Sequence, residues 1–232
     1  NWSRKNVFPK GTESIFAFAL GAVLDYKDRG CRVCDKTWYY SELCAKLVAW
    51  FNETAPGFFY TTIQCNKGYA ASLHDDGNNC GPSGIISLGI HIGGELWVWD
   101  EEGTETIVAT KDVEGWCKKG QSVKGSLFDI HNKLTVIDGC RPHCVMPFKG
   151  ERYSLVFFVA NSWASATPDV ETEIRKLMFR PPDKRCLELL QSGCGIYRPK
   201  VTAPVEAGGT PTRRFVLPSL SDDGLAPSCG AG

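Results

Sequence analysis

The chain has 232 residues, of which 43% are hydrophobic and 22% charged, a composition typical of a globular protein with one domain plus extensions. Its 26 basic and 26 acidic residues cancel, so it lacks the basic excess common in nucleic-acid-binding domains, although a local basic groove remains compatible with this total. No apolar stretch approaches the roughly 20 residues of a membrane-spanning helix, so we expect no membrane partner.

The 11 cysteines are an odd number, and no secretory signal is visible. We therefore expect reduced thiols and an intracellular protein, in the nucleus or the cytoplasm. Because the chain does not begin with Met, it is interpreted as a fragment or a processed product. Cys31 and Cys34 have the spacing of half a zinc site, but a second pair at that spacing is missing, which favours free buried thiols.

Residues 1–57 are predicted to form an extension that packs on the core. Within it, the apolar and Ala-rich run 15–24 fits either a strand or a short helix. A helix is predicted over 40–52, with Ser41 as its N-cap and Pro56-Gly57 after its end. Its apolar residues recur at helical spacing and are Leu43, Leu47, Val48 and Phe51.

Short β-rich runs follow from residue 58, separated by Gly, Asn and Asp. The predicted strands are 58–64, 69–73, 84–92, 95–99, 105–108, 126–130, 134–137 and 153–159. Many short strands with such turn signals indicate a sandwich or a barrel. The predicted class is therefore α+β, mainly β, with residues 58–162 as the core.

Residues 163–198 are predicted to be helical, with one helix over 168–179 and a shorter one over 183–191. Pro181-Pro182 separates the two. Residues 199–232 are rich in Pro, Gly, Ser, Thr and Ala and contain few large apolar residues, so we expect a low-complexity, disordered tail.

The strongest chemical signal is a split motif of two histidines and a carboxylate. His74 and Asp76 are two residues apart, which places both on one face of a strand, and His143 follows much later. Two histidines and one carboxylate form the facial triad that binds non-haem Fe(II) and leaves metal positions open. The alternative for His74 and Asp76 is a polar strand end that runs into a turn. We predict that these three residues are metal ligands and catalytic residues.

Arg152 and Ser154 also share a strand face, nine and eleven residues after His143. A buried arginine is costly unless it meets an anion, and its planar fork suits a carboxylate. A salt bridge to an internal acidic residue is the alternative. Beside the triad, a carboxylate cosubstrate is favoured, with the Ser154 hydroxyl as a second donor. Asn66 is a further candidate to hydrogen-bond this ligand, although turn formation explains it equally well.

These motifs resemble the Fe(II)/2-oxoglutarate-dependent dioxygenases over residues 58–160. The similarity is greatest to the branch that contains the TET and J-binding-protein oxygenases, which oxidise the 5-methyl group of pyrimidine bases. The motifs that carry it are Ile63-Gln64-x-Asn66, Gly93-Gly94-Glu95-Leu96 and Pro147-Phe148-x-Gly150-x-Arg152-Tyr153-Ser154-Leu155-Val156.

The resemblance implies a double-stranded β-helix (jelly-roll, cupin-like) core with flanking helices. It also implies Fe(II) bound by His74, Asp76 and His143, 2-oxoglutarate as cosubstrate, and O2 as the third reactant. Arg152 would pair with the distal carboxylate of 2-oxoglutarate, and Ser154 would assist.

The substrate stays open between two classes. The branch resemblance favours a methylated base in nucleic acid, whereas the Gly-Gly-Glu motif is shared with prolyl hydroxylases, which act on protein side chains. A non-catalytic binding module on the same scaffold is a further alternative, but an intact triad beside Arg152 argues against it. A cupin-like metal protein with other chemistry has no need of a buried partner for a carboxylate.

Several residues compete for these roles. His131 is the alternative third ligand, because Arg141 follows it at a spacing similar to that between His143 and Arg152. Arg141 sits in a Gly-Cys-Arg-Pro turn, so we expect it to be solvated, and we prefer His143 as the ligand. His91 lies in an apolar run and is expected to be a satisfied core residue.

The remaining polar and aromatic candidates have less specific signals. They are Asn78 near the motif, Trp97 and Trp99 on one strand face, and Lys118, Lys119 and Lys124 in a loop. Core packing is favoured over base stacking for the tryptophans. Solvated charge is favoured over phosphate contact for the lysines.

Overall fold

The computed structural model describes residues 7–9, 11, 13–192 and 205–206. The fold is mainly β, with antiparallel sheets and few helices. The predicted tail lies outside the described residues except for Val205–Glu206, which form the short strand β13. Among the described residues, no helix has the length and apolar character to cross a membrane.

The largest sheet has seven strands in the order β13-β9-β4-β12-β3-β1-β2, all of them antiparallel to their neighbours. Beyond β13, its strands are β9 (Lys133–Ile137), β4 (Asn79–Leu88), β12 (Tyr153–Ala160), β3 (Thr62–Lys67), β1 (Phe16–Leu24) and β2 (Cys31–Val33). The segment 15–24 is thus a strand, and it joins the same sheet as the strands of the predicted core.

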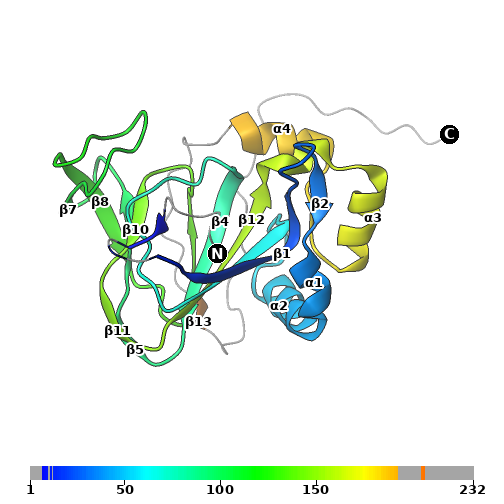
Figure 1. The fold of residues 1–232 in the computed structure, drawn as a ribbon, viewed down its shortest axis with the longest axis horizontal. Helices are drawn as coiled ribbons and strands as arrows, with labels where there is room; N and C mark the ends of the chain where they lie inside the picture. The colour runs from blue at the N-terminus through cyan, green and yellow to red at the C-terminus, as the bar shows by residue number, and fades with distance from the viewer. Residues whose placement is uncertain (1–6, 10, 12, 193–204, 207–232) are drawn as a thin grey trace.

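A second sheet has four strands in the order β10-β6-β8-β7. They are β10 (His143–Val145), β6 (Leu96–Trp99), β8 (Ser122–Phe128) and β7 (Glu105–Val108). A two-stranded pair, β5 (His91–Gly93) with β11 (Phe148–Gly150), adjoins it. In Figure 1 the four-stranded sheet lies on the left, the helices lie on the right, and the long strands of the larger sheet run between them.

The helices cover one face of the seven-stranded sheet. They are α1 (Asp35–Tyr39), α2 (Ser41–Thr54), α3 (Pro168–Lys176) and α4 (Lys184–Ser192), with a 3-10 turn over Asn161–Ser165. The ring of Phe51 on α2 stacks on Phe157 of β12, with centroids 3.8 Å apart. Since side chains alternate along a strand, Leu155 and Phe157 face this core, while Ser154 and Val156 face the other side of the sheet.

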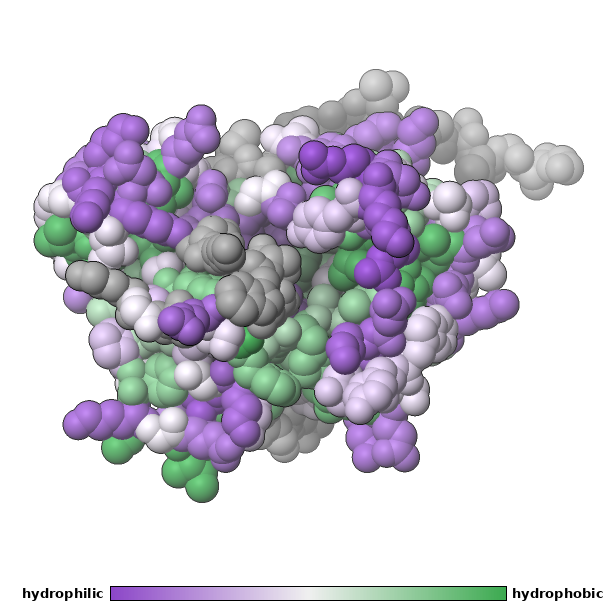
Figure 2. Space-filling model, in the orientation of Figure 1, coloured by the Kyte–Doolittle hydropathy of each residue, from purple (hydrophilic) through white to green (hydrophobic). Residues whose placement is uncertain are grey.

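The face of the molecule seen in Figure 1 is divided by polarity. Hydrophilic side chains cover most of it, and hydrophobic ones gather in the middle, between the four-stranded sheet and the helices (Figure 2). A cavity lies against the inner face of the large sheet, the face opposite to the helices.

Three local predictions were wrong, each for a definable reason. Ser41 is the first residue of α2 and Tyr40 its N-cap, without a side-chain capping bond. The segment 69–73 is not a strand, because its backbone bonds go to separate segments: Ala71 O accepts from Val145, and Ser72 N donates to Val7. The run 84–92 is divided at Gly89, whose φ of +105° breaks the strand and where a Cβ would strike the Glu151 carbonyl.

Candidate metal and cosubstrate site

The structure brings His74, Asp76 and His143 together, with one ligand atom of each within 4.8 Å of the others. Nε2 of His74 is 3.6 Å from Oδ1 of Asp76, and Nε2 of His143 is 3.8 Å from Oδ2 of the same carboxylate. His74 reaches this position through an isolated antiparallel bridge with His143, next to β10. The two histidines are buried, and Asp76 is partly exposed to a cavity that all three line.

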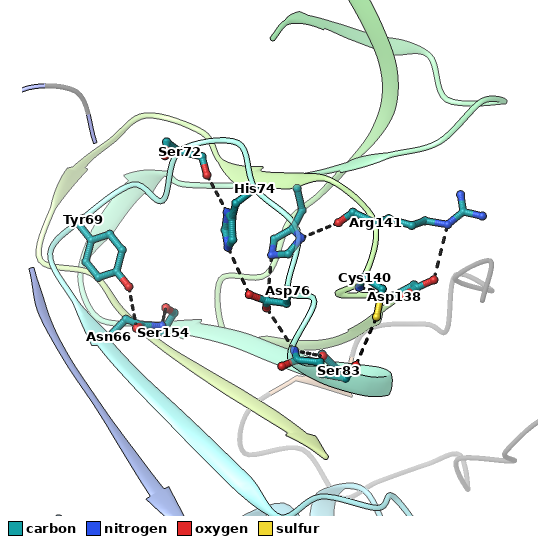
Figure 3. A network of polar contacts seen from close by, with 12 residues as sticks. Asn66, Tyr69, Ser72, His74, Asp76, Ser83, Asp138, Cys140, Arg141 and Ser154 are labelled. Atoms are coloured by element: carbon teal, nitrogen blue, oxygen red, sulfur yellow. Dashed lines mark hydrogen bonds and ion pairs between the residues drawn. The ribbon is translucent and has the colours of Figure 1, made fainter. Parts of the chain in front are cut away.

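Backbone carbonyls orient both imidazole rings. Nδ1 of His74 is 2.7 Å from the carbonyl oxygen of Ser72, and Nδ1 of His143 is 2.8 Å from that of Arg141 (Figure 3). A carbonyl only accepts, so in the neutral ring the proton lies on Nδ1 and the Nε2 lone pair faces Asp76. This is the arrangement that a metal-binding histidine needs.

The competing histidines lie elsewhere. The His131 and His91 rings lie against each other at a tilt of 35°, with centroids 4.0 Å apart, and Nε2 of His131 is 2.9 Å from the Gly89 carbonyl oxygen. His91 is buried, with Nδ1 2.9 Å from Gly93 O and Nε2 3.3 Å from Ser87 Oγ. His91 is therefore the satisfied core residue that its apolar surroundings predict. Its burial, with the positive charges of His131 and Arg152 nearby, lowers its pKa.

Arg152 is 2% exposed and lines the same cavity. Its Nη2 donates to the Gly94 carbonyl at 3.2 Å, whereas Nε is buried without a hydrogen-bond partner. Burial lowers the pKa of its guanidinium to about 10, and the nearby Tyr69 and Glu95 oppose this shift. No salt bridge involves Arg152 among the described residues, so the internal ion pair considered from sequence is not formed.

Gly94 leaves the space that the arginine occupies. Its φ is +82°, and a Cβ added there would lie 2.8 Å from Arg152 Nε and 3.0 Å from its Cδ. The guanidinium is thus placed by a backbone that approaches it without a side chain, which only glycine permits. The Gly93-Gly94 motif found in the sequence has this physical role.

Gly94→Ala is expected to displace Arg152 and weaken 2-oxoglutarate binding by about 10- to 100-fold, because one or two charge-assisted hydrogen bonds are lost. Titration calorimetry with Mn(II)-loaded protein measures this. Gly120→Ala is the matched control, since Gly120 has a similar φ of +87° but open space around its Cβ position. Equal weakening in both variants would contradict the steric explanation.

Ser154 and Asn66 lie side by side on neighbouring strands and line the cavity. Asn66 Nδ2 donates to Ser154 Oγ at 3.2 Å, and the hydroxyl of Tyr69 donates to Asn66 Oδ1 at 2.8 Å. Tyr69 did not emerge from the sequence, because it precedes the motif in a segment without regular structure. Its only signal there was its place three residues after Asn66.

The cavity has a volume of about 1030 Å³ and contains both groups of residues. The triad, Arg152, Ser154, Asn66 and Tyr69 all line it. The cluster of His74, Asp76 and His143 and a buried cation therefore face one space, which has room for a small dicarboxylate and part of a second molecule.

The chain resembles two solved oxygenases. One is an oxidoreductase of the 2OG-Fe(II) oxygenase family from Burkholderia pseudomallei, at 20% identity and a TM-score of 0.41 over 68% of this chain and 74% of that one. The other is NgTET1 in complex with 5mC DNA, at 14% identity and a TM-score of 0.34 over 69% of this chain and 68% of that one. No family model matches the chain, and no curated protein does.

The remaining residues considered from the sequence lie in the core, on the surface or at the cavity. Trp97 is buried in a core cluster against which Trp99 packs, which confirms core packing for both. Lys118 is exposed and pairs with Asp112 at 3.3 Å, and Asn78 lines the cavity. Cys31 is a buried free thiol whose pKa is raised by burial.

The prediction that Arg141 is solvated was wrong. Its side chain is 12% exposed rather than solvated, and its Nε lies 3.8 Å from Oδ2 of the fully buried Asp138. The turn that carries it bonds to Asp76, His143 and β6, and this packing excludes a loop arginine from water.

Proposed function

We propose that the chain is an Fe(II)- and 2-oxoglutarate-dependent dioxygenase that oxidises a C–H bond. The observation that carries this proposal is the convergence of His74, Asp76 and His143 with the unpaired, buried guanidinium of Arg152 in one cavity. A facial triad leaves metal positions open for other ligands. Burial of a cation is costly unless an anion pairs with it, so the guanidinium favours an anionic ligand.

The residues present fit both groups. Two imidazoles that present Nε2 to one carboxylate are the donor set preferred by non-haem Fe(II). The orphaned Nε of Arg152 and the Ser154 hydroxyl are donors for a carboxylate, which only accepts. Iron and 2-oxoglutarate, when bound, supply the activation of O2 that C–H oxidation requires.

The residues of the protein would hold and orient the metal and the cosubstrate. Carbonyl oxygens fix the two rings, and Arg152 and Ser154, both buried, would bind and orient the cosubstrate carboxylate. Burial strengthens the interaction of Arg152 with an anion, because the local dielectric is low.

The strand order supports a double-stranded β-helix for the core. His74 adds to the edge of the four-stranded sheet through its paired bonds with His143, so the order there becomes 74-β10-β6-β8. The facing sheet has the order β9-β4-β12-β3, and successive segments between β3 and β12 alternate mainly between the two sheets. This alternation is the pattern of a jelly roll.

The substrate would enter at the end of the cavity opposite Arg152. Register places Phe16 of β1 beside Lys67 of β3, near Arg152, so the other end of β1 and the connection to β2 lie far from the arginine. Tyr26, Arg29 and Arg32 of that region line the cavity.

This rim supports a methylated pyrimidine base in nucleic acid as the substrate. Arginine pairs with phosphate and an exposed tyrosine stacks on bases, and Tyr26 is well exposed. A base in a duplex would have to flip out to reach the metal. An intracellular location agrees with this substrate and with the free thiols among the described cysteines.

The test is conversion of 2-oxoglutarate to succinate by the purified chain with Fe(II) and an oligonucleotide that contains 5-methylcytosine. Turnover above a metal-free control is expected, with greater stimulation by the methylated than by the unmethylated oligonucleotide. No succinate above the control under any condition would contradict the enzyme. Succinate formation that does not respond to methylation would contradict only the proposed substrate.

A further inference from the structure

A four-residue turn lies beside the cluster of His74, Asp76 and His143 (Figure 3). It runs from Asp138 to Arg141, immediately after β9, and is closed by a bond from Arg141 N to Asp138 O at 3.1 Å. Oδ1 of Asp138 accepts from Cys140 N at 3.0 Å. Asp138 is completely buried and Arg141 nearly so, and their charged groups lie 3.8 Å apart. An ion pair is thus enclosed in a four-residue turn, where its burial has an energetic cost.

Two of the three triad residues depend on carbonyls of this turn. Asp76 N donates to Gly139 O at 2.9 Å, and the Nδ1 of His143 is 2.8 Å from Arg141 O. The turn therefore connects a ligand from the His-x-Asp half of the motif to the ligand from the distant half (Figure 3).

The same turn touches the residue that holds the Asp76 carboxylate. Asn79 Nδ2 is 3.2 Å from Asp76 Oδ2, and Cys140 Sγ donates to Asn79 O at 3.5 Å. Packing is tight, since a Cβ on Gly139 would lie 3.0 Å from Ser83 Oγ and 3.2 Å from Asn79 Nδ2. Movement of the turn would therefore shift both the backbone and the carboxylate of Asp76.

We infer that the Asp138–Arg141 ion pair is a positioning device for the metal centre, and that both residues act through the carbonyls of their turn. This inference rests on the proposed function. Arg141 Nη1 also lies 3.5 Å from the Trp99 carbonyl, so the guanidinium joins the turn to β6 of the four-stranded sheet. The pair thereby fixes where His143 presents Nε2 and where Asp76 presents its oxygens.

The alternative is that the pair only stabilises the fold. Two charges enclosed together contribute little net stability, and their joint replacement by neutral groups of similar shape is often neutral. A fold-stabilising role would therefore leave metal affinity unchanged in a folded neutral variant. A positioning role would lower metal affinity, because partners of metal-binding histidines typically change it by about 10- to 100-fold.

The experiment uses Mn(II) as the probe and compares two double variants of the full chain. Asp138→Asn with Arg141→Gln removes both charges of the turn. Asp129→Asn with Lys133→Gln removes an ion pair near the start of β9, whose residues do not line the cavity. Mn(II) affinity is measured by calorimetry, the ligand field of bound Mn(II) by EPR, and folding by melting of the metal-free protein.

We expect about 10- to 100-fold weaker Mn(II) binding and an altered EPR spectrum for the first double variant, with wild-type behaviour for the second. Arg141→Lys, which keeps a cation beside Asp138, is expected to recover most of the affinity.

Binding by the charge-free variant within twofold of wild type would overturn the inference. Failure of that variant to fold would also overturn it, because the pair would then serve the whole fold, and so would an Arg141→Lys variant that binds no better than the charge-free one. If the wild type itself binds no Mn(II), the proposed function fails first, which distinguishes the two failures.

Discussion

Replacement of His143 by alanine is expected to abolish divalent metal binding and, with it, succinate formation from 2-oxoglutarate. His143 is one of the three ligands proposed among the described residues, and its Nε2 lies 3.8 Å from Oδ2 of Asp76. With two ligands left, we expect metal affinity to fall by more than the roughly 100-fold typical of an outer-shell change. Calorimetric titration with Mn(II) and a succinate assay with Fe(II) measure the two effects.

His131→Ala is the matched control, because His131 is the other histidine that precedes an arginine at a similar spacing. Its ring contacts that of His91 and its Nε2 lies beside the Gly89 carbonyl, outside the triad. Metal affinity should stay at the wild-type level. Loss of binding in the His131 variant with retention in the His143 variant would transfer the ligand role and contradict the site described above.

Arg152→Met is expected to weaken 2-oxoglutarate binding by about 100-fold or more while Mn(II) still binds. A carboxylate paired with a buried guanidinium gains two charge-assisted hydrogen bonds, and their loss costs about 3 kcal/mol or more. Methionine approximates the aliphatic stem of arginine and so limits the packing change. Calorimetry with 2-oxoglutarate on Mn(II)-loaded protein gives the affinity.

The ligand-free Arg152→Met variant should melt at the wild-type temperature or above it. Burial of a cation without an ion-pair partner opposes folding, and the same burial lowers the pKa of this guanidinium to about 10. Lys149→Met removes an exposed cation from neighbouring β11 and should leave 2-oxoglutarate affinity unchanged. An Arg152 variant with wild-type 2-oxoglutarate affinity would refute the carboxylate role of this residue.

The local parts of the fold followed from sequence patterns. The helical spacing of Leu43, Leu47, Val48 and Phe51 predicted α2, and the strand over 105–108 coincides with β7. Patterns fail where backbone partners come from several segments. The chain at 69–73 bonds to separate parts of the molecule, and β10 and β11 have three residues each, too few for a periodic signal.

In the candidate site, too, the sequence predicted the local features but not the long-range contacts. The sequence predicted His74 and Asp76 as a ligand pair, because their spacing is a local feature. It also predicted Arg152 and Ser154 as partners of a carboxylate, because that prediction depends on residue type. The choice of His143 over His131 rested there on the turn that carries Arg141, since the two histidines precede an arginine at similar spacing. It is the bridge between His74 and His143 that brings the distant histidine to the site and leaves His131 beside His91.

The sequence by itself determined which residue types are available for a metal and a carboxylate, because donor chemistry belongs to the side chain and strand periodicity is a local property. Only the tertiary structure decided which of these residues share a cavity and which are buried. Arg141 shows the difference, since its Gly-Cys-Arg-Pro turn predicts a solvated charge, whereas packing against β6 and the metal site encloses it with Asp138. Burial depends on segments far apart in the chain, and no local pattern encodes their contact.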